Sequence, residues 1–126
     1  MSYKLTIEDQ GTCCVFSGSF TSNDLKNSNN EIAKLPHFPE LKYQLLNFHS
    51  VTEFPVDSNA IRAVAKQDFG LYKINEKIKV AIVANKLVVK GLAQMYKTYF
   101  ELEGNDIVWG IETFETNDEA RKWIIT

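Results

Sequence analysis

The sequence predicts a small α/β protein. We expect a five-stranded mixed sheet, with a mostly parallel core, an antiparallel hairpin at the N-terminus and about four flanking helices. From residue 43 onward, strand-like and helix-like segments alternate, which is the order of βαβ units with parallel strands. Residues 78–84 are almost all apolar and do not alternate, which is typical of a central strand covered on both faces.

The N-terminal segment has the pattern of an antiparallel hairpin. Residues 3–8 alternate between apolar and polar side chains, as in a half-buried strand. Residues 9–11 carry a turn signal, and residues 12–17 form the second predicted strand. Because the connection is short, we expect the first strand to lie antiparallel to the second at one edge of the sheet.

Residues 43–49 and 107–111 are the third and fifth predicted strands, and residues 51–55 are expected to form a loop. The first helix begins at a capping box made by Thr21 and Asp24, and prolines end it at residues 36 and 39. The second helix is capped by Asp57 or Ser58. Its predicted apolar face comprises Ile61, Ala65, Phe69 and Tyr72.

Two further helices follow. Asn85 is expected to cap the third helix, and Gly104 with Asn105 to close it. Its predicted apolar stripe comprises Val88, Leu92, Met95, Tyr96 and Tyr99. Thr116 and Glu119 make a capping box for the last helix. Its predicted apolar face comprises Ala120, Trp123 and Ile124.

Length and charge narrow the function classes. The chain has 126 residues, which predicts one domain over residues 1–126. A net charge of −2 offers no basic field for a phosphate backbone, so we expect no nucleic-acid partner. No apolar run approaches the length of a membrane span, and the N-terminus lacks the order of a signal peptide. We therefore expect a cytoplasmic protein.

The residues that usually carry chemistry are scattered. Cys13 and Cys14 are adjacent in a predicted strand, where they favour two reduced thiols over a disulfide or a nucleophile. His37 and His49 lack companions at metal-ligand spacing. Neither a glycine-rich nucleotide loop nor a nucleophile elbow is present. We expect no metal, no cofactor, no catalytic residue and no enzyme activity.

Aromatic residues near loops leave two interpretations open. Phe20, Phe38 and Phe54 fall in or beside predicted loops and not on helical stripes. They either cover the core or form an exposed patch for a partner or an apolar ligand.

The stretch from Leu46 to Ile61 resembles the signature of STAS domains, the sulfate-transporter and anti-sigma-factor-antagonist family. In that signature a strand leads through a short loop to Asp-Ser-Ser-Gly-Leu at the start of a helix. Other stretches resemble the SpoIIAA-like branch, which is grouped with STAS and SEC14 domains. They are residues 18–24, 80–83, 92–96, 114 and 119–124.

The resemblance implies a sheet flanked by helices and a binding or regulatory role without catalysis. In the antagonist proteins the second serine of the signature is phosphorylated. Asn59 stands at that position here, Ala60 replaces the glycine, and Ser58 matches the preceding serine.

Two function hypotheses follow. The first is a protein-interaction module whose partner surface lies near residues 50–61 and includes Phe54, Asp57, Ser58 and Asn59, with Ser58 open to phosphorylation. In the structural alternative, Asp57 or Ser58 is only a helix cap. The second hypothesis is a small-molecule or lipid-binding domain of SEC14-like character, with residues 50–59 and 85–88 facing one rim. A homodimer through an apolar helix is consistent with either hypothesis.

Overall fold

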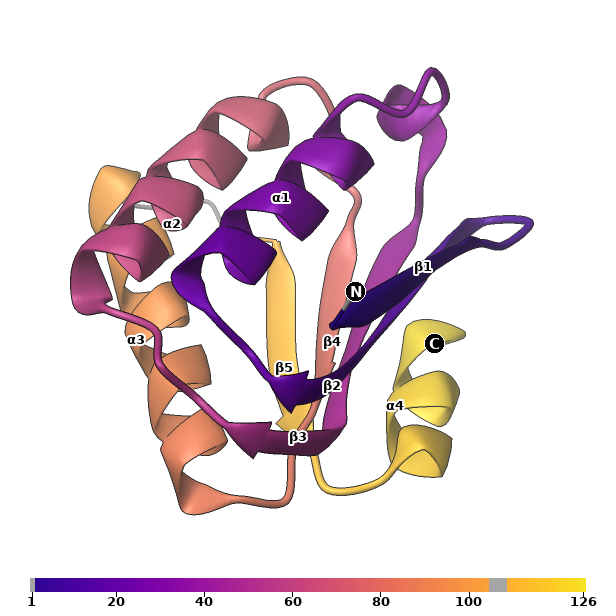
Figure 1. Ribbon diagram of the computed structural model, residues 1–126. Helices are drawn as coiled ribbons and strands as arrows, with labels where there is room; N and C mark the ends of the chain where they lie inside the picture. The colour runs from indigo at the N-terminus through magenta and orange to yellow at the C-terminus, as the bar shows by residue number, and fades with distance from the viewer. Residues whose placement is uncertain (1, 105–108) are drawn as a thin grey trace.

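The computed structural model describes residues 2–104 and 109–126. Within these residues, a five-stranded sheet has the order β1-β2-β3-β4-β5 (Figure 1). The strands are β1 (Tyr3–Ile7), β2 (Gly11–Ser19), β3 (Tyr43–Glu53), β4 (Lys79–Val83) and β5 (Gly110–Phe114). β1 is antiparallel to β2, and all other neighbouring strands are parallel. The predicted mixed sheet, with an antiparallel strand at one edge, is confirmed.

Helices cover both faces of this sheet unequally. They are α1 (Ser22–Ala33), α2 (Ser58–Tyr72), α3 (Leu87–Glu103) and α4 (Asn117–Ile124), with a short 3-10 helix at Phe38–Glu40. α1, α2 and α3 lie on one face and α4 lies on the other (Figure 1). Packing agrees with this arrangement, because Ala120 of α4 contacts Leu45 and Ala81 on the face of the sheet away from α2.

β4 is the interior strand that the apolar run predicted. It lies between β3 and β5, and Val80 and Ile82 are buried toward α2 and α3. Ala81 and Val83 are buried toward α4. Apolar side chains on both faces are what a strand covered by two helix layers requires. Phe20 and Phe38 are also buried, so these two aromatic residues cover the core.

The predicted loop at residues 51–55 was placed too early. β3 continues to Glu53 because β2 also extends beyond its predicted end and pairs with it, through Ser17 with Ser50 and Ser19 with Glu53. The register shifts twice along this pairing, and Gly18 adopts a φ of 67° at the second irregularity. Such irregular pairing leaves no simple alternation for the sequence to display.

The boundaries around α3 and β5 also differ from prediction. Lys86, not Asn85, occupies the cap position of α3 and makes no side-chain capping bond. Val88 of the predicted stripe is half exposed, and its neighbour Val89 is buried instead. β5 begins at Gly110, whose position is set by pairing with Lys79 of β4. Residues 105–108, which include Asn105 and the start of the predicted fifth strand, lie outside the described residues.

Candidate functional site

Asp57 forms the cap at the start of α2. Its backbone is extended, with φ −90° and ψ 158°, and its carboxylate accepts a 2.8 Å hydrogen bond from the backbone N–H of Ala60. Its own N–H donates to Oγ of Ser22 at 3.2 Å, which ties the segment to the start of α1. The structure therefore resolves the predicted choice of cap in favour of Asp57.

Ser58 and Asn59 occupy the exposed first turn of α2. Among the described residues, neither side chain takes part in a hydrogen bond. Because the first N–H groups of a helix lack intrahelical partners, this turn favours negative charge. The Ser58 side chain is thus exposed and is not the cap of α2.

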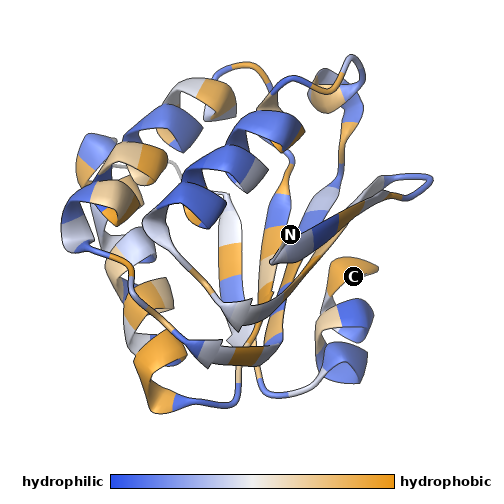
Figure 2. Ribbon diagram, in the orientation of Figure 1, coloured by the Kyte–Doolittle hydropathy of each residue, from blue (hydrophilic) through white to orange (hydrophobic). Residues whose placement is uncertain are grey.

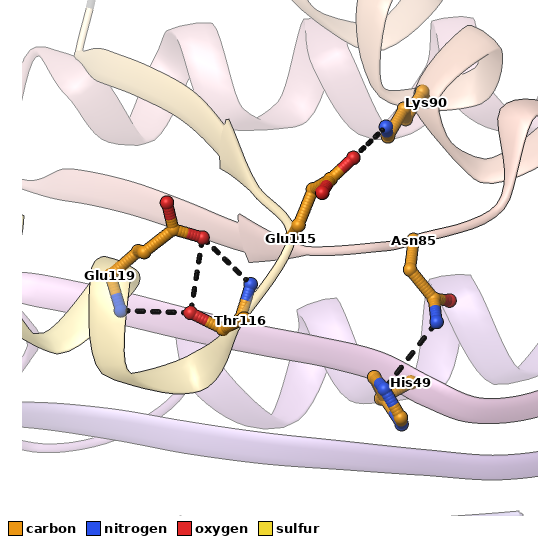
Figure 3. Close-up of polar contacts among 6 residues, drawn as sticks. All are labelled: His49, Asn85, Lys90, Glu115, Thr116 and Glu119. Atoms are coloured by element: carbon orange, nitrogen blue, oxygen red, sulfur yellow. Dashed lines mark hydrogen bonds and ion pairs between the residues drawn. The ribbon is translucent and has the colours of Figure 1, made fainter.

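Two segments distant in sequence meet at the end of β3. The Nζ of Lys86 donates a hydrogen bond to the carbonyl oxygen of Val51 and lies 5.8 Å from the ring centre of Phe54. Nearby, Nδ2 of Asn85 lies 3.4 Å from Nε2 of His49 (Figure 3). These contacts bring Val51 and Phe54 together with Lys86. We call residues 50–59 and 85–88 the C-terminal rim, and their action as one surface stays a prediction.

Exposed apolar side chains belong to the same rim. Leu87 is 85% exposed and Val88 is 51% exposed. Figure 2 colours the start of α3 as hydrophobic. Beyond them, Lys90 forms a 2.8 Å ion pair with Glu115, at the loop that leads into α4 (Figure 3). The rim therefore combines apolar surface with an exposed helix start.

A cavity of about 80 Å³ lies between the sheet and the helices α1, α2 and α3. Phe54 lines it, whereas Asp57, Ser58 and Asn59 lie outside it at the surface. The four predicted site residues are near one another in sequence but do not form one site. Phe54 faces the interior cavity, whereas the other three are exposed at the surface. The lining is mainly apolar, and its polar members are Asn29, Gln44, Asp68 and Tyr96.

Asp68 of α2 is the buried acid of this cavity. It is 3% exposed, and its carboxylate accepts hydrogen bonds from the Tyr96 hydroxyl at 2.6 Å and from Nδ2 of Asn29 at 3.0 Å. Burial raises the pKa of Asp68 to about 6, and these two hydrogen bonds oppose the rise. Sequence reasoning missed this residue, although Asp68 stands seven positions after Ile61 on the apolar face of α2.

The two cysteines are thiols of raised pKa. Cys13 and Cys14 are free thiols, and burial raises the pKa of Cys14 to about 12 and also raises that of Cys13. Both are therefore protonated at neutral pH. The part of the chain that the structure describes holds no group of three or more His, Cys, Asp or Glu side chains arranged for a metal. No helix among the described residues is long and apolar enough to cross a membrane.

Comparison with solved structures defines the class of fold. The anti-sigma factor antagonist SpoIIAA in its unphosphorylated form superposes with a TM-score of 0.63 at 10% identity, over 98% of this chain and 97% of that one. The Bacillus cell fate determinant SpoIIAA in its phosphorylated form gives 0.62 at 9% identity, over 97% and 98%. An uncharacterized protein from Shewanella loihica with a SpoIIAA-like fold gives 0.56 at 13% identity, over 97% and 91%.

The chain therefore has a SpoIIAA-like fold. At these identities the likeness shows the fold alone. No family model matches the sequence, and no curated protein matches it significantly.

Proposed function

We propose that this protein is a non-catalytic regulatory module that binds a protein partner through the C-terminal rim. The observation that carries the proposal is the exposed first turn of α2, where Ser58 has no capping role because Asp57 provides the cap. Phe54, Leu87 and Val88 would supply apolar contact surface on the same rim. Apolar anchors next to a polar, hydrogen-bonding segment are typical of protein interfaces.

The structural neighbours support a regulatory role. SpoIIAA is described as an anti-sigma factor antagonist and has both unphosphorylated and phosphorylated forms. We infer that this chain, like SpoIIAA, acts by association and not by catalysis. The protonated, buried state of the Cys14 thiol is consistent with that inference and with a reducing, cytoplasmic location.

Ser58 is the residue through which binding could be regulated. A phosphate on its hydroxyl would add up to about two negative charges at the start of α2, where the helix dipole favours them. The helix would therefore stay folded while the charge of the contact surface changes. Asn59, which resembles the family's acceptor position, has no hydroxyl and would act only as a contact residue.

The test is affinity capture from the source organism with wild-type protein and with Ser58→Glu, followed by quantitative mass spectrometry. We expect a specific partner to be depleted by about tenfold or more with Ser58→Glu, because the new charge changes the centre of the surface. The matched control is Asn117→Glu. Asn117 is also exposed and also begins a helix, but α4 lies on the opposite face of the sheet.

The two variants separate the outcomes. A partner retained by Asn117→Glu but lost by Ser58→Glu, with unchanged melting temperatures for both, supports the proposal. Equal capture of every protein by both variants would contradict a partner surface at Ser58. Native mass spectrometry of the purified protein covers the second hypothesis, because it would detect a bound small molecule or lipid.

Small-molecule binding is the second candidate function. The observation that favours it is the mainly apolar cavity between the sheet and the helices α1, α2 and α3. Its volume of about 80 Å³ is well below the roughly 300–1,000 Å³ of sites that enclose drug-sized ligands. The cavity is therefore suited to a small molecule and too small to enclose a whole lipid.

A further inference from the structure

The cavity has the dimensions of a site for a very small molecule. A buried water needs roughly 10–15 Å³, so a cavity of about 80 Å³ has room for roughly five water-sized groups. Leu46, Phe48 and Ile82 of the sheet form part of its apolar wall. Phe54 and Val56, which belong to the C-terminal rim, also line the cavity and are only partly buried. A molecule of about five non-hydrogen atoms fits this space.

One side of the cavity carries an unneutralised acid. Among the described residues, Asp68 accepts side-chain hydrogen bonds only from neutral groups, the Tyr96 hydroxyl and the Asn29 amide. Among the described residues, no Lys, Arg or His side chain forms an ion pair with it. The burial-raised pKa of about 6 still leaves Asp68 mainly ionised at neutral pH. Buried carboxylates are usually paired with a cation, so this position lacks the partner that its burial calls for.

The sheet side of the cavity carries one polar side chain, that of Gln44. Gln44 of β3 is 4% exposed and lines the cavity, and its side-chain amide takes part in no hydrogen bond within residues 2–104 and 109–126. Thr12, its register neighbour on β2, has a buried hydroxyl without a partner among the described residues, but Thr12 does not line the cavity. Buried polar groups are nearly always hydrogen-bonded, so the unpartnered Gln44 amide in the cavity wall favours a polar group in the occupant.

We propose that this cavity binds a short primary aliphatic amine, whose ammonium group pairs with Asp68 and whose hydrocarbon chain occupies the apolar part. A cation supplies the charge that Asp68 lacks, and an anion would be repelled. The side-chain oxygen of Gln44, which also lines the cavity, is available to accept a hydrogen bond from the ligand. This binding does not depend on the partner surface at Ser58.

The experiment is an NMR titration of the uniformly ¹⁵N-labelled protein at neutral pH with three probes of similar size. They are n-butylamine, which is a cation at this pH, n-butanol, which is neutral, and butyrate, which is an anion. We expect saturable shifts at cavity residues with n-butylamine, at an affinity about tenfold or more above that of n-butanol, and none with butyrate. Equal affinities for amine and alcohol, or no saturable amine binding, would overturn the proposal.

Variants assign the effect to the cavity. Asp68→Asn keeps the size of the side chain and removes its charge, so amine affinity should fall about tenfold while n-butanol binding stays unchanged. Asp118→Asn removes an exposed acid from α4 and should leave amine binding unchanged. Ala93→Leu enlarges a cavity-lining side chain on α3 and should abolish binding of both probes.

These variants keep the proposal falsifiable even where one of them folds poorly. Undiminished amine binding by a folded Asp68→Asn variant would overturn it. If Asp68→Asn does not fold, undiminished binding by Ala93→Leu would overturn it instead. Loss of amine binding in Ser58→Glu would also count against a site inside the cavity, because Ser58 does not line it.

Discussion

At the scale of single residues, Asp68 shows how burial sets the chemistry of a carboxylate. It lies on the face of α2 that packs against the sheet, and it joins helices α1 and α3 through Asn29 and Tyr96. Both hydrogen bonds stabilise the charged form, but burial disfavours it more strongly, and the pKa rises to about 6. The buried charge of Asp68 therefore lowers the stability of the folded protein at neutral pH.

We predict that this cost appears as a pH dependence of stability. The pKa of Asp68 is near 3.8 in the unfolded chain and about 6 in the folded protein, so the folded state holds its proton more tightly. The free energy of unfolding that Asp68 contributes in its protonated form is therefore lost as the pH rises from 3.8 to about 6. Above that window the loss is complete and amounts to about 3 kcal/mol.

Urea unfolding of wild type and Asp68→Asn between about pH 4 and about pH 8 measures this effect. The stability of the variant relative to wild type should increase by up to about 3 kcal/mol across the window and then level off. If the difference in free energy of unfolding between wild type and Asp68→Asn does not change with pH, the pKa of Asp68 is not raised on folding.

At the scale of elements, helix caps position the candidate partner surface. Thr21 and Asp24 form the predicted capping box of α1, and Thr116 and Glu119 form that of α4 (Figure 3). In α2 the Asp57 carboxylate alone performs this task, which leaves Ser58 exposed on the first turn. At the start of α2, Asp57 therefore has the structural role, and its neighbour Ser58 is the candidate functional residue.

We predict that Asp57→Ala lowers the free energy of unfolding by about 1 kcal/mol, because the N–H of Ala60 loses its partner. Ser58→Ala should change it by less than about 0.5 kcal/mol, since that side chain caps nothing. Chemical denaturation of both variants measures the two effects. A larger loss in Ser58→Ala than in Asp57→Ala would reverse the assignment of the cap.

At the scale of the whole molecule, an ion pair joins the two ends of the chain. The guanidinium of Arg121 in α4 contacts both carboxylate oxygens of Glu8, at 2.6 and 2.8 Å, after the first strand of the hairpin. The Tyr43 hydroxyl of β3 donates to the same carboxylate. These bonds hold the pKa of Glu8 below its usual value, with the hydrogen bonds from Arg121 as the main cause. The edge hairpin is thus linked to the helix on the α4 face.

We predict a coupling of about 1 kcal/mol between Glu8 and Arg121 in a double-mutant cycle with Glu8→Gln and Arg121→Met at neutral pH. Because the pKa of Glu8 is lowered on folding, the coupling should be present above its ordinary value of 4.5 and should disappear as the pH falls below it. The exposed pair Lys90–Glu115 serves as the control and should show a much smaller coupling. Equal coupling in both pairs would contradict a special role for the Glu8 contact.

The local patterns of the sequence determined which elements form and how most of them pair. Alternation predicted the edge hairpin, the apolar run predicted the interior strand β4, and capping boxes predicted the starts of α1 and α4. These features depend on neighbouring residues, because strand and helix periodicities bring nearby side chains to one face. The STAS resemblance added the fold that the comparisons support.

Only the tertiary structure decided the end of β3, the register of β5 and the composition of the cavity. β3 extends because β2 pairs with it, and β5 begins where β4 provides a partner. Gln44 and Asp68 read as ordinary polar residues in sequence, but the packing of α2 on the sheet places both at one cavity. Registers and cavities arise from contacts between distant segments, and the relative placement of those segments is set by how the whole core packs.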